Sequence, residues 1–370
     1  MNILIVSEKP SVSRALAPTA RAHWPTDGIT IVHANPYDNI KFNYPHAMRM
    51  PAIPIVSQPK NRLNSWDTWH CPPVVLAADG TLVPVEMTKE LFTNADVIIH
   101  AGSPDHTGAV AFYVLLEQVF GDSRALECPV LMLSSLDALT VVGTPEQVQQ
   151  VCQTAINEMQ PFSRSCATRF EFGMMKRYFD WNWNVNSLSI LGEAQHRAGV
   201  SADVPPVSKY ALQLLYALQA EPPLTDAQIV NLMQHWSGTG RYGYKADDSR
   251  SSLGASAWRP SLGSHRSAWR ILENLETAGL LERAILDING PVRPQERGQT
   301  VLSLSACGRN LLAKLHPECK DLDLPFRIDA WCDKGLASKR AIDRYIKDFF
   351  GKQLRFASQD VQREQPNESL

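Results

Sequence analysis

The sequence lacks the marks of a secreted or membrane-spanning protein. Its seven cysteines are odd in number and include no Cys-x-x-Cys pair, which argues against a disulfide framework and a zinc ribbon. No stretch approaches the roughly 20 apolar residues of a membrane span, and the apolar start at residues 1–6 is too short for a signal peptide. We therefore expect a cytoplasmic protein with reduced thiols and no membrane partner.

The sequence also lacks a strong excess of charge of either sign. Lys and Arg number 36 and Asp and Glu number 38, so the formal net charge is -2. Any surface that binds nucleic acid must then be a local patch. With 370 residues, of which 44% are hydrophobic, the chain is long enough for two or three domains with buried cores.

Strand patterns alternate with helix patterns in the N-terminal part. Apolar runs at 3–6, 29–32, 95–101 and 129–133 indicate strands, and helices are expected from Ser11 to about Ala17, before Pro18, and over 108–120. The segment 35–92 shows no clear period. This order predicts an α/β domain with a parallel sheet over residues 1–155.

The rest of the chain is predicted to be mainly helical. Residues 156–206 form a helical connecting segment, and residues 207–356 begin with helices near 209–220, 225–236 and 265–278, the last ended by Gly279. Strands at 280–286 and 300–304 follow, with an Asn-Gly turn at 289–290. Three helices and a hairpin are the order of a winged helix-turn-helix. Further helices are expected at 306–315 and 339–350, and residues 357–370 are expected to form a flexible tail.

Two polar segments follow predicted strands. Glu8-Lys9-Pro10-Ser11 ends the first strand, and residues 100–108, which contain Asp105, end the third. Ligands bind at the carboxyl ends of strands in open parallel sheets. A carboxylate at this edge could act as a general acid or base or bind a metal, and Lys9 could meet a phosphate. The alternative is a solvated loop, with Asp105 only capping a turn or the next helix.

Together these two segments resemble the Toprim domain of type IA DNA topoisomerases. The resemblance places the family's Mg²⁺-binding Asp-x-Asp-x-Glu-Gly signature on Ser103, Asp105, Thr107 and Gly108, so that one of its three acids remains. Mg²⁺ binds through carboxylate oxygens, and neutral hydroxyls are poor substitutes for them. We expect either no metal or a weakly bound Mg²⁺ held by Glu8 and Asp105.

Residues 177–188 resemble the segment that follows Toprim in the same family. Arg177, Asp180, Trp181, Asn186 and Ser187 fit the pattern, whereas a leucine occupies position 188, where the family has arginine. The aromatic residues here could stack on the bases of a single strand. We favour a core position, because aromatic side chains bury large areas.

Tyr244 is placed by the resemblance where type IA enzymes have their nucleophilic tyrosine. Asp248-Ser249-Arg250 fits the frame, but Lys245 and Ala246 replace the family's proline and arginine. A phenol with a pKa of about 10 needs activating partners, and these are depleted here. The alternative is a glycine-rich loop between helices.

A local excess of basic residues surrounds the third predicted helix. Residues 263–268 resemble the family's Gly-Thr-x-Ala-Thr-Arg block, with Ala268 in place of the arginine, and Arg266 and Arg270 lie one helical turn apart. The candidate phosphate-binding residues are Arg241, Lys245, Arg250, Arg259, Arg266 and Arg270. The alternative is a winged helix that binds protein and has a solvated charged face.

These features predict a topoisomerase-like DNA-binding protein with a degenerate Toprim site. The interval before Tyr244 is too short for the large arch of full-length family members. We therefore expect a non-catalytic scaffold or accessory subunit, with protein partners in a DNA-processing assembly such as one carried by a mobile element. The alternatives are a divergent metal-dependent topoisomerase or nuclease that uses Glu8, Lys9, Asp105 and Tyr244, and a protein-binding adaptor.

Overall fold

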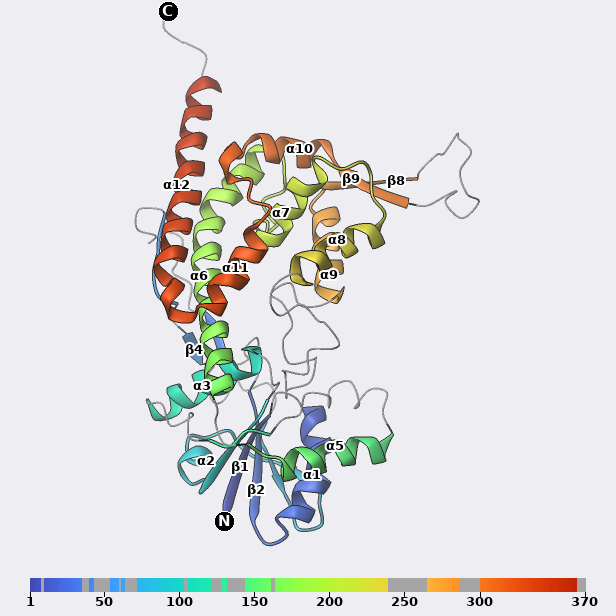
Figure 1. Cartoon of the computed structure of the whole chain (residues 1–370), viewed down its shortest axis with the longest axis vertical. Helices are drawn as coiled ribbons and strands as arrows, with labels where there is room; N and C mark the ends of the chain where they lie inside the picture. The colour runs from blue at the N-terminus through green and yellow to red at the C-terminus, as the bar shows by residue number, and fades with distance from the viewer. Residues whose placement is uncertain are drawn as a thin grey trace, which may run out of the picture. The chain divides into compact units, whose positions relative to one another are not determined.

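A computed structural model gives the fold of the chain (Figure 1). It describes residues 1–7, 10–34, 40–42, 54–59, 61–63, 72–102, 106–121, 128–131, 144–160, 164–238, 265–285 and 300–364. These residues form two compact units, one drawn from 1–43 and 60–174 and the other from 44–59, 175–243 and 259–370. Among them, no helix combines the length and apolarity that crossing a membrane requires.

The first unit is a mixed α/β structure. Its elements are β1 (Asn2–Ser7), α1 (Pro10–His23), β2 (Gly28–His33), β3 (Ile40–Phe42), β4 (Asn61–Leu63), β5 (Val74–Leu76), β6 (Leu82–Pro84), α2 (Glu90–Thr93), β7 (Val97–Ala101), α3 (His106–Phe120), α5 (Pro145–Asn157) and the start of α6 (Arg164–Arg197). Five strands form one sheet in the order β6-β5-β2-β1-β7, and β3 pairs with β4.

The centre of the sheet is parallel and one edge is antiparallel. β1 lies between β2 and β7 and runs parallel to both, as the alternating pattern predicted. β5 and β6 extend the sheet in antiparallel fashion from the segment that had no clear period. The strand expected at 129–133 is present, within the described residues, as a bridge from Val130 to His100. The expectation of a parallel sheet is thus correct for the centre and wrong for the β5–β6 edge.

Both faces of the sheet are covered. Ile3 and Ile5 face one core cluster together with residues of α1 and α5. Leu4 and Val6 face a second cluster with Phe92 of α2 and residues of α3. Successive residues of β1 point to opposite faces, so its continuous apolar run is buried on both sides.

Helix α1 is longer than expected, because it continues through Pro18 to His23. Leu16, Ala17 and Ala20 are buried beside the sheet, whereas Pro18 is exposed. Burial of this face outweighs the loss of one backbone hydrogen bond at the proline.

The second unit is mainly helical. Besides the rest of α6, it contains α7 (Lys209–Leu218), α8 (Asp226–Gly238), α9 (His265–Thr277), β8 (Leu281–Ile285), β9 (Thr300–Leu304), α10 (Ala306–Ala313), η5 (Pro317–Cys319), α11 (Leu324–Asp333), η6 (Gly335–Ser338) and α12 (Lys339–Glu364). α12 continues past Phe356 into the stretch expected to be a tail.

The elements from α7 to β9 agree closely with the sequence-based expectation. β8 and β9 pair in antiparallel register, with Leu281 opposite Leu304. Leu224, just before α8, also bridges to Leu302 of β9 in antiparallel fashion. Gly279, which ends α9, has φ of +68°, a conformation that glycine adopts without strain.

Candidate functional site

The carboxyl ends of β1 and β7 are neighbours in the first unit. Ser7, the last residue of β1, is in register with Ala101, the last residue of β7. Adjacent strands lie about 4.8 Å apart. The segments that carry Glu8 and Asp105 therefore start from adjacent strands.

A buried chain of hydrogen bonds lies beside this edge. Ser13 Oγ of α1 is 2.6 Å from His33 Nε2 at the end of β2, and 3.2 Å from Ser7 Oγ at the end of β1. All three side chains are buried. They hold the first turns of α1 to the ends of two strands, next to the Glu8-Lys9 segment. Sequence reasoning missed this chain because it joins residues up to 26 positions apart.

The end of β7 is held by His100. Its Nδ1 accepts a hydrogen bond from the Gly102 backbone N–H at 3.0 Å, and its ring stacks on Phe112 of α3 at a centroid distance of 4.3 Å. The imidazole is buried. It therefore fixes the start of the second candidate segment.

Most of the predicted site residues lie outside the described part of the chain. These are Glu8, Lys9, Ser103, Asp105, Arg241, Tyr244, Lys245, Arg250 and Arg259. Within the described part, no three His, Cys, Asp or Glu side chains gather in a way that could hold a metal ion. The metal ligands predicted from the sequence, Glu8 and Asp105, lie outside this part, so they stay a prediction.

The aromatic segment of α6 is core, as favoured above. Tyr178, Phe179, Trp181 and Trp183 are all at most 4% exposed. Phe179 and Trp183 pack against α11 and α12, with Trp183 4.9 Å from the ring of Phe349. These rings are not available to stack on bases.

Asp180 in the same segment forms a partly buried ion pair. Its Oδ1 accepts a hydrogen bond from Lys209 Nζ at 2.5 Å, and Lys176 Nζ lies 3.9 Å from its Oδ2. Burial raises the pKa of Asp180, but attraction by Lys209 and Lys176 outweighs burial and lowers the pKa overall. Asp180 is thus a charged structural group that joins α6 to α7.

Helix α9 presents an exposed cation from the predicted basic set. Arg270 is exposed, whereas Leu272 and Leu275 are buried. Arg266 lies one turn earlier on the same helix. Ala268 is 1% exposed, so an arginine at this position could not contact DNA from this helix. This block therefore lends no support to the resemblance, although Arg270 itself is exposed.

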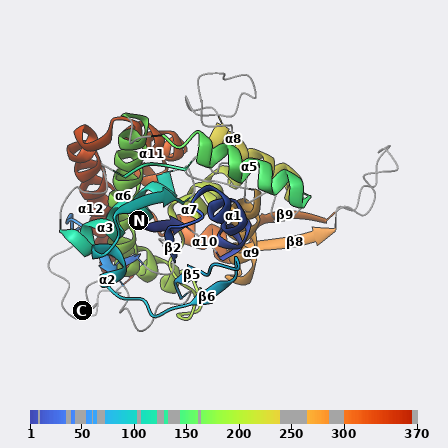
Figure 2. The same cartoon turned by 90° about the horizontal axis from the view of Figure 1, so that it is seen from below.

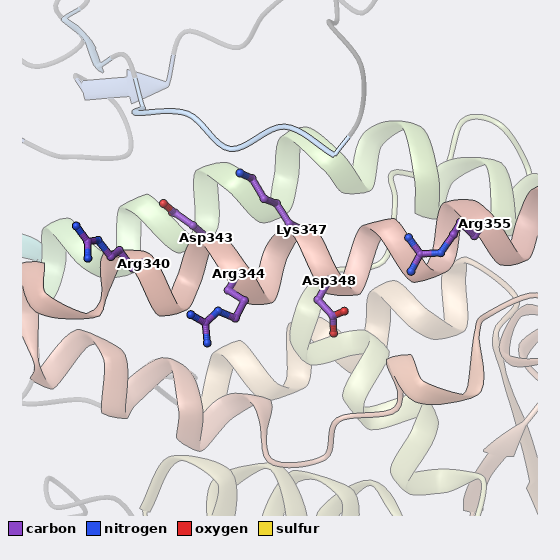
Figure 3. Close-up of a pocket in the computed structure, with 6 residues that line it drawn as sticks. All are labelled: Arg340, Asp343, Arg344, Lys347, Asp348 and Arg355. Carbon is purple, nitrogen blue, oxygen red and sulfur yellow. The ribbon is translucent and has the colours of Figure 1, made fainter.

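Helix α12 carries exposed cations that sequence reasoning missed. Arg340, Arg344, Lys347 and Arg355 line a shallow surface pocket with Asp343 and Asp348 (Figure 3). We call these four basic residues the α12 cation row. A helical wheel over 339–364 would have revealed it, because its members recur at spacings of four, three and eight residues.

No known protein-family model matches the chain, and no curated protein is significantly similar to it.

Proposed function

We propose that this chain is a topoisomerase-like protein that binds double-stranded DNA through a winged helix and acts as a scaffold or accessory subunit. The observation that carries the proposal is the arrangement of α7, α8, α9 and the β8–β9 hairpin. In winged helix-turn-helix proteins, the helix before the hairpin enters the major groove. Here that helix is α9, which carries Arg266 and Arg270.

The bridge from Leu224 to Leu302 supports this proposal. It joins the segment between α7 and α8 to the β8–β9 hairpin through one bridged pair of residues. Residues 209–304 thus follow the order helix, bridging residue, two helices and hairpin. This support is independent of any resemblance to topoisomerases.

A non-catalytic role is favoured by the chemistry of the Toprim-like edge. Adjacent strand ends would bring Glu8 and Asp105 toward one site, but Ser103 and Thr107 offer neutral hydroxyls where the family has acids. Mg²⁺ bound there would neutralise charge on a phosphodiester. Two carboxylates are a usual protein contribution to a Mg²⁺ site, but neutral hydroxyls in place of the other acids lower the negative charge that attracts the ion. We therefore propose that Mg²⁺ binds weakly and that DNA is held rather than cut.

Duplex binding by an α9 variant tests this proposal. Arg266→Ala combined with Arg270→Ala should weaken binding to a labelled duplex by about tenfold or more, and should lower the salt slope by about 1.8, because each phosphate contact contributes about 0.9. Fluorescence anisotropy over a salt series measures both quantities.

The matched control is Lys320→Ala combined with Lys334→Ala. These are two exposed cations of the same unit, and neither forms an ion pair with the described residues. The control should bind DNA like the wild type. Equal affinity and equal slope for the α9 variant and the wild type would contradict the proposed role of α9. A wild-type protein with no salt-dependent affinity for DNA would instead favour the protein-binding adaptor.

A further inference from the structure

The α12 cation row follows the length of the helix. Arg340, Arg344, Lys347 and Arg355 are all exposed, with Arg340 and Lys347 extending from one side of the helix and Arg344 from the other (Figure 3). From Arg340 to Arg355 the helix rises by about 22 Å. The row thus spans roughly four helical turns.

The four cations are not neutralised by the protein. None of them forms an ion pair with another described residue. Of the two acids beside the row, Asp348 pairs with Lys352 at 2.8 Å, and Asp343 accepts a hydrogen bond from the uncharged hydroxyl of Tyr178 at 2.6 Å. Four cations and two acids line the pocket, so positive charge is in excess there. Cations without internal partners leave their charge available to an external anion.

Helix α12 is a firmly held platform for the row. Ile342, Ile346 and Phe350 on its opposite face are fully buried. Gln353 is also buried; it accepts a hydrogen bond from the His316 N–H at 2.7 Å and donates one to the Lys314 carbonyl at 2.9 Å. The helix backbone that carries the cations is therefore fixed by the core of the second unit.

Gly351 lies on α12 midway between Lys347 and Arg355, the last two members of the row. A methyl group at this position would meet only Arg355 Nη1, at 3.6 Å, which is an ordinary contact. The packing therefore does not require glycine, although glycine inside a helix costs about 1 kcal/mol relative to alanine. A bare backbone among cations permits the close approach of a ligand such as a phosphate.

We propose that the α12 cation row is a second DNA-contacting surface, which binds the phosphate backbone of a duplex without reading its sequence. Four cations spread along about 22 Å of one helix suit an extended polyanion with one charge per about 1.7 Å of helix axis. The row has no aromatic side chain on which single-stranded bases could stack. Since the apolar face of α12 is buried, the helix cannot insert into a lipid surface.

This surface is distinct from α9. In both views α12 and the α8–α9 pair lie at different sides of the second unit (Figures 1 and 2). The inference rests on the proposed DNA-binding function, but on different residues. It can therefore fail while the role of α9 stands, and the reverse also holds.

The test removes the charges of the row. Arg340→Gln, Arg344→Gln and Lys347→Gln together should weaken duplex binding on the order of tenfold or more and lower the salt slope by about 2.7, at about 0.9 per contact. The control is again Lys320→Ala with Lys334→Ala, and circular dichroism checks that each variant is folded. The α9 variant is measured in parallel with two unrelated duplex sequences.

A second variant separates binding from folding. Gly351→Ala should raise the unfolding temperature, because alanine favours the helix, and should weaken duplex binding severalfold by blocking close approach. Loss of stability and of binding together would instead mark Gly351 as structural and would count against the inference.

The outcomes distinguish the two proposals. Wild-type affinity and slope in the triple variant, with weakened binding in the α9 variant, would overturn the α12 surface alone. Weakened binding in the triple variant only would support the α12 surface and overturn the role of α9. Tighter binding of the wild type to anionic phosphatidylserine vesicles or to a single strand than to the duplex would also overturn the inference.

Discussion

Individual residues of α6 hold a distant segment of the chain through its backbone. Asn186 Oδ1 accepts a hydrogen bond from the Ile55 N–H at 2.7 Å, and its Nδ2 donates to the Ile55 carbonyl at 2.8 Å. Asn182 Oδ1 accepts from the Ser57 N–H at 2.8 Å, and Trp181 Nε1 donates to Ser57 Oγ. Asparagine is a poor helix former, and these bonds explain the presence of two of the three asparagines of α6, Asn182 and Asn186. The two amides satisfy extended backbone as a neighbouring strand would.

Asn186→Ala should therefore destabilise the second unit. The buried amide makes both bonds to Ile55, and their loss leaves backbone groups without partners, at a cost of about 2–3 kcal/mol. Denaturant unfolding measures this loss, and limited proteolysis should show faster cleavage within 44–59. Leu188→Ala, at an exposed position of the same helix, should change little. Equal stability of the Asn186→Ala and Leu188→Ala variants would show that the hydrogen bonds between Asn186 and Ile55 do not contribute to the free energy of unfolding.

At the scale of elements, the hairpin is joined to the helices before it by one arginine. Arg283 of β8 contacts Glu276 of α9 through two hydrogen bonds, at 2.7 and 2.8 Å, and Asp226 of α8 at 3.0 Å. The hydrogen bond from Arg283 lowers the pKa of Glu276. This stabilising contribution is therefore present at neutral pH and is lost as the pH falls below the usual range of a glutamate. The network orients the hairpin relative to α9.

Arg283→Ala should cost about 1 kcal/mol of unfolding free energy at low salt, a modest value because the side chain is about one-third exposed. The difference from the wild type should shrink at high salt and below pH 4, since screening and protonation both weaken the network. Denaturant unfolding at two salt concentrations and two pH values measures this. A loss of unfolding free energy that does not change with salt or pH would instead indicate that the aliphatic part of the Arg283 side chain stabilises the unit by packing.

Sequence patterns predicted some elements well because their signals are local. α7 begins at Lys209 after the cap Ser208, and α9 ends before Gly279, both as residue chemistry indicates. The antiparallel β5–β6 edge and the hydrogen bonds between Asn186 and Ile55 depend on partners far along the chain, which no local pattern contains. The α12 cation row escaped notice because its members are spread over 16 residues of a helix expected to end near Phe350.

For the whole molecule, the central question is whether DNA binding persists without cleavage. The sequence predicts a Toprim-like edge with few acids, and the sheet brings the strand ends that precede Glu8 and Asp105 side by side. The second unit contributes cations on α9 and α12. This distribution favours a protein that holds DNA for other components of an assembly over one that passes strands.

The most direct measurement is a titration of supercoiled plasmid with the pure protein across salt, with and without Mg²⁺ or Mn²⁺, analysed on a gel that reports binding, nicking and relaxation together. We expect a salt-dependent shift that does not require the metal ions, with the plasmid still supercoiled after the protein is removed. Metal-dependent nicking or relaxation, lost in Asp105→Asn and Glu8→Gln variants, would contradict the scaffold role and establish an enzyme.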